Sequence, residues 1–456
     1  MLPVLTTAES GRLDREAADR IDQLMERAGW AVAGAAIEVG ARYGSRVSVL
    51  TGPGNNGGDG WVAAARLAGR GCLVTVHPLA EPKTEVATRA RNRALDAGVG
   101  VSSLSADASP DVVIDALFGS GISRELPHEV QRWIDLDVPM VAAHVPSGLD
   151  PDTGIATGRV FRADVTVAFH ALSPGHLIGA GPDLCGVVRV ADIGLDGGDP
   201  VMEVVTDADA ALPRRPRTAH KWSAGSVLVV GGSRGMIGAP VMAAKAALRF
   251  GASAVGLAVP EELQEAASIL APEILSYSQH DLPARFDVVV AGPGMGQDES
   301  AWRRVTDHPG TLVLDADALT AHTGPVVASR NGPTVLTPHA GELERLTRGP
   351  AGWESACEFA ERVSAVVVLK GNPTFVCGRG VPAVVTSNGP ELATIGSGDV
   401  LVGMIAAAIA RGLSPFDGAL AGSHWHGVAA ADLATERSVT ADALVEHVAR
   451  FAQVTR

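Results

Sequence analysis

Residues 47–61 read VSVLTGPGNNGGDGW. The opening VSVLTG is rich in branched residues and predicts a buried strand, whereas the remainder is too glycine-rich for an ordinary helix start. Glycines let a backbone approach a ligand closely, so this stretch predicts a turn that cradles phosphate at the end of a strand. Asparagine and aspartate also favour turns without any ligand, which is the alternative for Asn55, Asn56 and Asp59.

The strand pattern recurs through the first part of the chain. Residues 9–39 carry apolar side chains such as Leu24 and Ala28 at helical spacing, so a helix precedes the first strand. Helical stretches then alternate with strand-like stretches at 47–52, 72–77, 111–119, 138–143 and 164–169. This order predicts parallel strands joined by crossover helices, a Rossmann-like, three-layer α/β fold.

The alternation stops at residues 199–219, DPVMEVVTDADAALPRRPRTA, which are rich in proline, charge and small side chains. It resumes at strand-like stretches within 225–235, 286–296, 310–319, 334–342 and 365–376. A chain of 456 residues also exceeds what one ordinary core supports. We therefore predict two α/β domains, residues 1–208 and 209–456.

Composition excludes several function classes. The formal charge of -14 has no basic block, which argues against a nucleic-acid partner. No apolar run reaches the roughly 20 residues of a membrane span, and the first residues lack the pattern of a signal peptide. We expect a cytoplasmic enzyme, without a membrane partner, that forms a homo-oligomer.

The four cysteines are scattered without a Cys-x-x-Cys pair, and they are Cys72, Cys185, Cys357 and Cys377. This spacing indicates neither a zinc site nor a disulfide framework. Buried, reduced thiols are the expectation.

A second glycine-rich turn occurs at residues 394–403, TIGSGDVLVG, ahead of an apolar run that predicts a helix. Amides at such a helix start bind phosphate. A carboxylate beside bound phosphate is repelled by it, so Asp399 fits the task of taking a proton from a hydroxyl that attacks a phosphoryl group. The alternative is that Asp399 only caps the helix.

Six stretches from residue 220 onward are specific: HKWSAGSVLVVGGSRGMIGAPVMAAKAALRFGA, AGPGMG, LDADAL, LTPHAGE, LKGNPTFV and LATIGSGDVLVG. In this order they resemble the ADP-dependent NAD(P)H-hydrate dehydratases, a family with a ribokinase-like fold. The resemblance implies that ADP phosphorylates the C6 hydroxyl of hydrated NADH or NADPH (NADHX or NADPHX) and that phosphate is then eliminated. It implies binding of the S epimer only, and phosphoryl transfer leads us to expect Mg²⁺.

The same resemblance assigns residues in the second domain. Asp399 is implied to be the general base, and the amides of residues 396–398 the anion hole. The implied hydrate site comprises Ala239, Gly294, Gly296, His339 and Asp399. The implied adenine-nucleotide site comprises Lys370, Gly371, Asn372, Pro373, Thr374, Gly396, Ser397 and Gly398. The family usually has a small residue where Ile395 stands, so this side chain is expected to narrow the anion pocket.

The first domain has its own specific stretches: LMERAG, GPGNNGGDGW, DALFGSG, VPSGLDPDTG and DIGL. Together they resemble the NAD(P)H-hydrate epimerases, and the fused pair resembles a bifunctional NAD(P)H-hydrate repair enzyme. The resemblance implies K⁺ ligation by Asn56, Asp115 and Ser147. It implies that the hydrate is bound by Asn55, Asn56, Gly57, Gly58, Asp59, Gly119, Ser120, Gly121, Ile122, Ser123, Arg124, Glu125 and His144.

Two positions depart from the epimerase pattern. His144 stands where aspartate is usual, and Ser173 where lysine is usual. We therefore expect slow epimerisation. Two alternatives remain open: a dehydratase whose first domain only binds or acts as a scaffold, and a small-molecule kinase on the ribokinase-like fold, although the sugar-kinase pattern Asp-Thr-x-Gly-Ala-Gly-Asp is absent.

Overall fold

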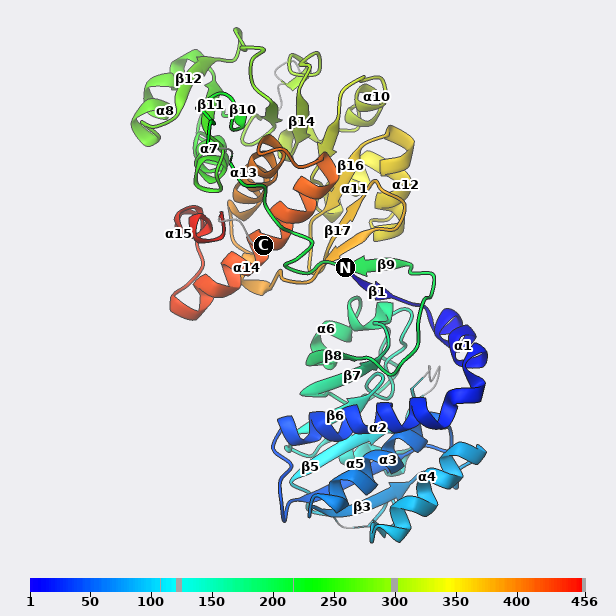
Figure 1. Ribbon diagram of the computed structural model, residues 1–456. Coiled ribbons are helices and arrows are strands. Elements are labelled where there is room, and N and C mark those ends of the chain that lie inside the picture. The colour runs from blue at the N-terminus through cyan, green and yellow to red at the C-terminus, as the bar shows by residue number, and fades with distance from the viewer. Residues whose placement is uncertain (107, 120–124, 216, 297–301, 453–456) are drawn as a thin grey trace. The chain divides into compact units, whose positions relative to one another are not determined.

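The computed structural model describes residues 1–106, 108–119, 125–215, 217–296 and 302–452 (Figure 1). It divides into two compact units, Leu2–Met202 and Glu203–Arg456, the second of which also includes Met1. The division falls inside the proline-rich 199–219 segment and slightly before residue 208.

The N-terminal unit alternates strands and helices. Its 9–39 region is two helices, α1 and α2, separated by a 3₁₀ turn at Ala18–Arg20. Its elements are β1 (Leu2–Val4), α1 (Thr7–Glu16), α2 (Ile21–Glu38), β2 (Arg46–Thr51), α3 (Asn55–Gly69), β3 (Leu73–Pro78), α4 (Glu85–Asp96), β4 (Gly100–Val101), β5 (Val112–Ala116), α5 (His128–Ile134), β6 (Met140–Ala143), β7 (Val165–Phe169), α6 (Gly181–Leu184) and β8 (Val187–Ala191).

Strands β2 to β8 form a parallel sheet between two layers of helices, which confirms the predicted three-layer α/β fold. The strand order is β4-β3-β2-β5-β6-β7-β8. Helices α2, α3 and α4 pack on one face, where Trp61 is buried against Val49 and its neighbours. Helix α5 covers the other face through Val130 and Trp133.

The glycines of the opening stretch are explained by close packing at the start of α3. The helix begins at Asn55, after the N-cap Gly54, so the predicted turn is the first turn of a helix. A Cβ atom on Gly57 would lie 1.9 Å from the carbonyl oxygen of Gly52, and one on Gly60 would lie 2.7 Å from the Cβ of Ala116. Only glycine therefore lets α3 start directly at the end of β2.

The C-terminal unit is a second α/β sandwich. Its elements are β9 (Met202–Val204), β10 (Ser226–Val230), α7 (Gly238–Arg249), β11 (Ala254–Val259), α8 (Gln264–Leu270), β12 (Leu275–Ser278), β13 (Val288–Ala291), β14 (Thr311–Leu314), α10 (Thr323–Ala328), β15 (Thr334–Leu336), α11 (Ala340–Thr347), α12 (Trp353–Val363), β16 (Val366–Leu369), β17 (Thr374–Cys377), β18 (Ala383–Val385), α13 (Ser397–Ala410), α14 (Pro415–Glu436) and α15 (Ala441–His447).

Its strands follow the order β9-β18-β17-β16-β15-β14-β13-β10-β11-β12. The pairs from β12 to β16 are parallel, whereas β17 pairs antiparallel with both β16 and β18. The short KGNP connection at 370–373 returns the chain beside β16, and this hairpin gives the sheet its mixed character. Helices α7, α13 and α14 pack together in the main core of the unit (Figure 1).

The expectation of four reduced thiols is wrong for one pair. Cys357 on α12 and Cys377 on β17 form a disulfide, with Cα atoms 4.9 Å apart. Helix α12 packs against β17, and this tertiary contact brings together residues that are 20 positions apart in the sequence. Cys72 and Cys185 are free and buried.

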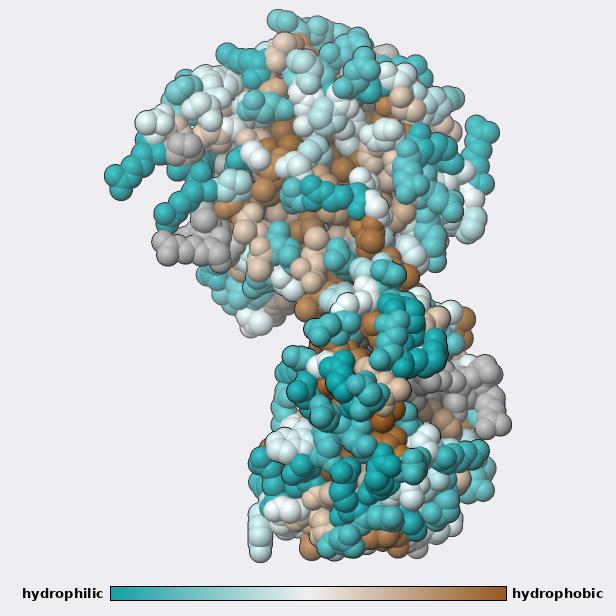
Figure 2. Space-filling model, turned by 45° about the vertical axis from the view of Figure 1, so that its right-hand side comes forward, coloured by the Kyte–Doolittle hydropathy of each residue, from teal (hydrophilic) through white to brown (hydrophobic). Residues whose placement is uncertain are grey.

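Within the described ranges, no helix is long and apolar enough to cross a membrane. Figure 2 shows mainly hydrophilic residues on the visible face of each unit, with apolar residues in the recesses.

Candidate active sites

Polar side chains of the C-terminal unit collect where its parallel strands end. Asp315 directly follows β14, Thr337 follows β15 and Lys370 follows β16. Neighbouring parallel strands end at the same edge of a sheet, where α/β proteins bind ligands. The parallel arrangement of β14, β15 and β16 therefore brings residues that are distant in the sequence to one edge of the sheet.

Lys370 lies between two acidic side chains. Its Nζ is 2.6 Å from Oδ1 of Asp315 and 3.7 Å from Oε2 of Glu342. Thr337 Oγ1 also donates to Asp315 Oδ1 at 2.7 Å. Burial lowers the pKa of Lys370, but Asp315 and Glu342 outweigh it and raise the pKa above its ordinary value. Lys370 is a fixed cation at neutral pH.

The start of α13 faces this cation. Gly396 is the N-cap residue with φ of 87°, and a Cβ there would lie 2.7 Å from Met242 Cε. A Cβ on Gly398 would lie 3.7 Å from Lys370 Nζ. The first amides of a helix lack intrahelical partners and attract anions, so helix start and ammonium together favour a negatively charged ligand.

Asp399 lies in the first turn of α13. Burial raises its pKa to about 7, with a further increase from Asp315 and an opposing decrease from Lys370. A carboxyl group with this pKa is partly ionised at neutral pH and accepts a proton more readily than an ordinary aspartate. The site therefore combines an anion-attracting surface with a base of suitable strength.

Three residues predicted to bind the hydrate lie around the loop after β13. A Cβ on Gly294 would lie 3.3 Å from that of Ala239, on the first turn of α7, so these two residues are neighbours. Gly294 and Gly296 both have positive φ, of 60° and 73°. The amide of Gly296 donates to Asp317 Oδ2 at 2.8 Å, which ties the loop to the segment after β14.

His339 has a structural role in addition to its predicted one. Its Nδ1 accepts the amide hydrogen of Glu342 at 3.2 Å, and the amide of His339 donates to Glu342 Oε2 at 2.7 Å, so the pair caps α11. The backbone of His339 also bridges to Lys370. Its side chain is 57% exposed, which leaves the ring accessible to a ligand.

The predicted nucleotide loop connects β16 to β17. Thr374 Oγ1 donates to the carbonyl of Gly371 at 2.9 Å and accepts from Asn388 Nδ2 at 2.7 Å. Asn372 and Pro373 form the tip between them. In the glycine turn, Ser397 Oγ bonds to the carbonyl of Thr394. The loop and the turn are thus both held by side-chain hydrogen bonds.

Ile395 does not narrow the anion pocket as expected. Its side chain is 95% exposed, because the left-handed Gly396 that follows it reverses the chain before α13. The side chain of Ile395 therefore points to solvent.

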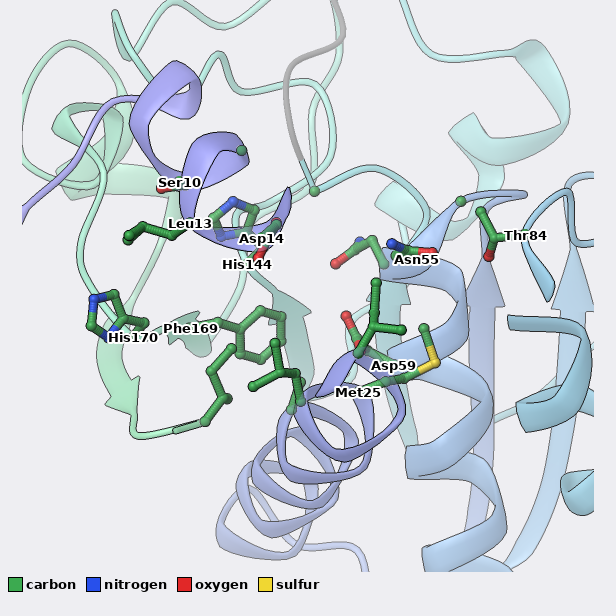
Figure 3. Close-up of a pocket in the computed structure, with 18 of the residues that line it drawn as sticks. Ser10, Leu13, Asp14, Met25, Asn55, Asp59, Thr84, His144, Phe169 and His170 are labelled. Atoms are coloured by element: carbon green, nitrogen blue, oxygen red, sulfur yellow. The ribbon is translucent and has the colours of Figure 1, made fainter. Parts of the chain in front are cut away.

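The N-terminal unit contains a cavity of about 500 Å³, here called the N-terminal cavity. Figure 3 shows its walls, which come from α1, α2, α3 and the loops after β5, β6 and β7. Asn55, Asn56, Asp59, Gly119 and His144 line it. The residues of two predicted motifs therefore meet in one cavity.

Other predicted hydrate ligands lie elsewhere. Gly57 and Gly58 are buried in the packing of α3, and neither they nor Glu125 line the cavity. Glu125 is exposed and contacts the Gly158 region. Five predicted residues lie outside the described part of the chain: Ser120, Gly121, Ile122, Ser123 and Arg124.

Of the three residues predicted to bind K⁺, Asn56 lines this cavity and the other two do not. Asp115 and Ser147 accept hydrogen bonds from the amides of Leu117 and Phe118, which do line it. Asp115 is fully buried, and its carboxylate accepts from Ser147 Oγ and Ser147 N, both at 2.7 Å. A Cβ on Gly119 would lie 3.0 Å from Asn56 Oδ1, and Asn56 Nδ2 is buried without a partner. Burial raises the pKa of Asp115 to about 6, so ionising it there is costly.

Hydrogen bonds to its backbone amide and carbonyl hold His144 in place. Its amide donates to Val167 at 2.8 Å, its carbonyl accepts from His176 Nε2 at 2.8 Å, and its φ is 70°. Burial lowers the pKa of His144 to about 4, and its Nδ1 has no partner. The imidazole is therefore neutral at pH 7. Ser173 is buried in the turn that includes His176 and does not line the cavity.

Sequence reasoning missed several residues. Glu342 and Asp315, which hold Lys370, had no assigned role, although an acidic residue directly after a buried strand was a usable signal. Asp14 and Thr84 line the N-terminal cavity but belong to no recognised motif. Only the fold brings them to the cavity.

Comparisons with known proteins agree with the two-unit organisation. A family model described as NAD(P)H-hydrate dehydratase matches residues 227–450, and one described as YjeF-related protein N-terminus matches residues 21–175. The bifunctional NAD(P)H-hydrate repair enzyme Nnr of Thermofilum pendens is 34% identical, with 96% of this chain and 93% of that protein covered. The enzyme of the same name from Salinibacter ruber is 35% identical, with 99% and 96% covered.

Among solved structures, a ribokinase-like superfamily protein from Enterococcus faecalis aligns with a TM-score of 0.51. It is 22% identical, and the alignment covers 55% of this chain and 95% of that one. This likeness shows the ribokinase-like fold. With both family models matched, neither the small-molecule kinase nor the dehydratase whose first domain only binds or acts as a scaffold is favoured.

Proposed function

This chain belongs to the family of bifunctional NAD(P)H-hydrate repair enzymes, and we propose that its C-terminal unit dehydrates the S hydrate at Asp399 while the N-terminal cavity interconverts the R and S epimers. One observation carries the first assignment: a carboxyl group with a pKa of about 7 lies in the first turn of α13, whose start is beside the Lys370 ammonium. The substrates are NADHX and NADPHX.

In the proposed dehydration, the carboxylate of Asp399 takes the proton of the C6 hydroxyl as that oxygen attacks the terminal phosphoryl group of ADP. The amides of residues 396–398 and the ammonium of Lys370 stabilise the charge that develops on the phosphoryl oxygens, a term that is usually the largest in such reactions. The transfer breaks the bond between the terminal phosphorus of ADP and its bridging oxygen and leaves AMP. Phosphate then departs from C6 as a proton is lost from C5, which forms the C5=C6 double bond of the repaired ring. Asp315 and Glu342 position Lys370 for this task.

We place the hydrate against Ala239, Gly294, Gly296 and His339, and the nucleotide against the 370–374 loop. Among the described residues, no group of three or more His, Cys, Asp or Glu side chains is arranged to hold a metal ion. Mg²⁺ commonly binds through substrate phosphates and only one or two carboxylates. Mg²⁺ therefore fits this site as a partner of the nucleotide, where it would neutralise phosphate charge.

The residues around Asp115 fit K⁺. The carboxylate is completely buried, and its hydrogen-bond partners in the described structure are the neutral donors of Ser147 and Leu117. A cation offsets the cost of such a buried charge, and an all-oxygen ligand set suits a hard ion. We propose that Asn56, Asp115 and Ser147 hold it, which would orient the start of α3 toward the hydrate.

Recovery of reduced-nicotinamide absorbance from mixed NADHX epimers, with and without ADP, tests the assignment. Full recovery requires both activities, and a plateau near the S fraction, before spontaneous epimerisation matters, means dehydration alone. The Asp399→Asn variant should lose recovery but keep nucleotide binding. Asp281→Asn, an exposed carboxylate in a bend after β12, is the matched control. Recovery within a few-fold of wild type in Asp399→Asn removes Asp399 from the mechanism. The homo-oligomer and the cytoplasmic location stay predictions.

A further inference from the structure

The N-terminal cavity contains a carboxylate that no recognised motif supplies. Asp14 lies near the end of α1 and lines the cavity, which Asp59 enters from the first turns of α3 (Figure 3). The side chain of Asp14 stays accessible, whereas Asp59 is 8% exposed. Two carboxyl groups therefore face one cavity from different elements.

These two groups affect one another electrostatically. Burial raises the pKa of Asp59 well above its ordinary value, and the charge of Asp14 raises it further. Desolvation by the cavity wall also raises the pKa of Asp14, against smaller decreases from Arg15 and His170. An ionised Asp14 therefore favours the protonated form of Asp59, which is the deeper of the two carboxyl groups.

No other described side chain of the cavity offers this combination. The titratable residues that line it within the described part of the chain are Asp14, Asp59, His144 and His170. His144 is neutral, and its Nδ1 is buried without a partner, so it offers one polar atom to a ligand. His170 Nε2 is within hydrogen-bond distance of the carbonyl of Gly197 at 2.9 Å. Position 144 thus lacks the carboxylate that is usual there.

We propose that Asp14 is a catalytic residue of epimerisation, which acts with Asp59 as an acid–base pair and replaces the carboxylate that position 144 lacks. This inference rests on the proposed function of the N-terminal unit. The ligand class is a hydrated nicotinamide ring with a hydroxyl group on C6, next to the ring nitrogen N1.

The step balances with a single water molecule. The protonated carboxyl group gives its proton to the C6 hydroxyl, the C6–O bond breaks, and water leaves while the N1 electron pair forms a C6=N1 double bond. Water then adds to the opposite face of C6 and gives a proton to the ionised carboxylate, and the double-bond electrons return to N1. The proton has moved from one carboxyl group to the other, and exchange with solvent at the accessible Asp14 restores the starting state.

The test uses the full chain and pure R-NADHX, and the unaltered dehydratase unit of each variant, at saturating ADP, reports formation of the S epimer. Asp14→Asn should slow conversion of the R epimer by about 10²-fold or more, the usual range for a general acid or base. Asp14→Glu should recover part of the rate because it restores a carboxyl group. The matched control is Asp19→Asn, an exposed aspartate in the turn after α1 that does not line the cavity.

Direct conversion of pure S-NADHX should be unchanged in all three variants, and thermal unfolding shows whether each is folded. In Asp14→Asn, the rate of R conversion should no longer change with pH on one side of the pH optimum. Loss of a merely structural residue would not remove this pH dependence. If wild type epimerises and a folded Asp14→Asn does so equally fast, or if Asp14→Glu is as slow as Asp14→Asn, Asp14 is not catalytic. If wild type itself never converts the R epimer, the proposed epimerase function fails and this inference with it.

Discussion

Asp315→Asn should shift the pH dependence of dehydration toward lower pH. Asp315 raises the pKa of Asp399, second only to burial, and Lys370 lowers it. Removing the Asp315 charge therefore lowers the pKa of the base and also frees the Lys370 ammonium, which lies 2.6 Å from Asp315, to act on Asp399. An asparagine oxygen can still accept from Thr337 Oγ1, so the local packing is preserved.

The size of the effect follows from the wild-type pKa of about 7. A base with this pKa is about 1% ionised at pH 5, so kcat there should be about 100-fold below its plateau. Each unit by which Asp315→Asn lowers the pKa raises the fraction of ionised base at pH 5 about tenfold relative to wild type. The plateau itself should fall, because Lys370 loses the partner that positions it.

The assay is the initial rate of absorbance recovery from pure S-NADHX at saturating nucleotide between pH 5 and 8. Asp399→Asn is the control, and its residual rate must not fall between pH 7 and pH 5, since the titrating base is absent. An unchanged or higher midpoint in Asp315→Asn, or a limb that persists in Asp399→Asn, would refute the assignment of Asp399 as the base.

Three further predictions concern single sites. Lys370→Ala should weaken nucleotide binding by about 1.5–3 kcal/mol, more than hydrate binding, as measured by calorimetry; equal losses contradict the assignment. His144→Asp should speed conversion of the R epimer, because it returns a carboxylate to position 144, whose left-handed backbone, with φ of 70°, aspartate tolerates. If the wild type converts the R epimer as fast as this variant or faster, the missing carboxylate does not limit epimerisation. The pKa of Asp115 is raised from 3.8 to about 6, so its protonation contributes about 3 kcal/mol of stability below pH 3.8 that is lost as pH rises through 6. K⁺ should therefore slow hydrogen exchange at β5 at pH 8 and hardly at pH 4, and equal protection at both values argues against K⁺ at Asp115.

The fold class of both units could be predicted from the sequence alone. Branched stretches between helical segments predicted parallel sheets, and the glycine turns lie at strand ends because only glycine permits the close packing seen at Gly57 and Gly60. Both family resemblances rested on such local stretches. Local patterns succeed here because backbone preference and the periodicity of apolar residues can be recognised within short stretches of the chain.

The electrostatics of the two sites depended on tertiary structure. The resemblance assigned Lys370 to the nucleotide site, but its pairing with Asp315 and Glu342 depends on three strands ending at one edge of the sheet. The disulfide depends on the contact between α12 and β17.

The same limit applies to the N-terminal cavity. The sequence showed that position 144 lacks aspartate, but not that burial keeps its imidazole neutral or that α1 brings Asp14 to the same cavity as Asp59. A pKa is set by burial and by charges within a few ångströms, and these come from residues far apart in the chain. Local sequence therefore determined which elements form, and packing between those elements decided the charge and the neighbours of each reactive group.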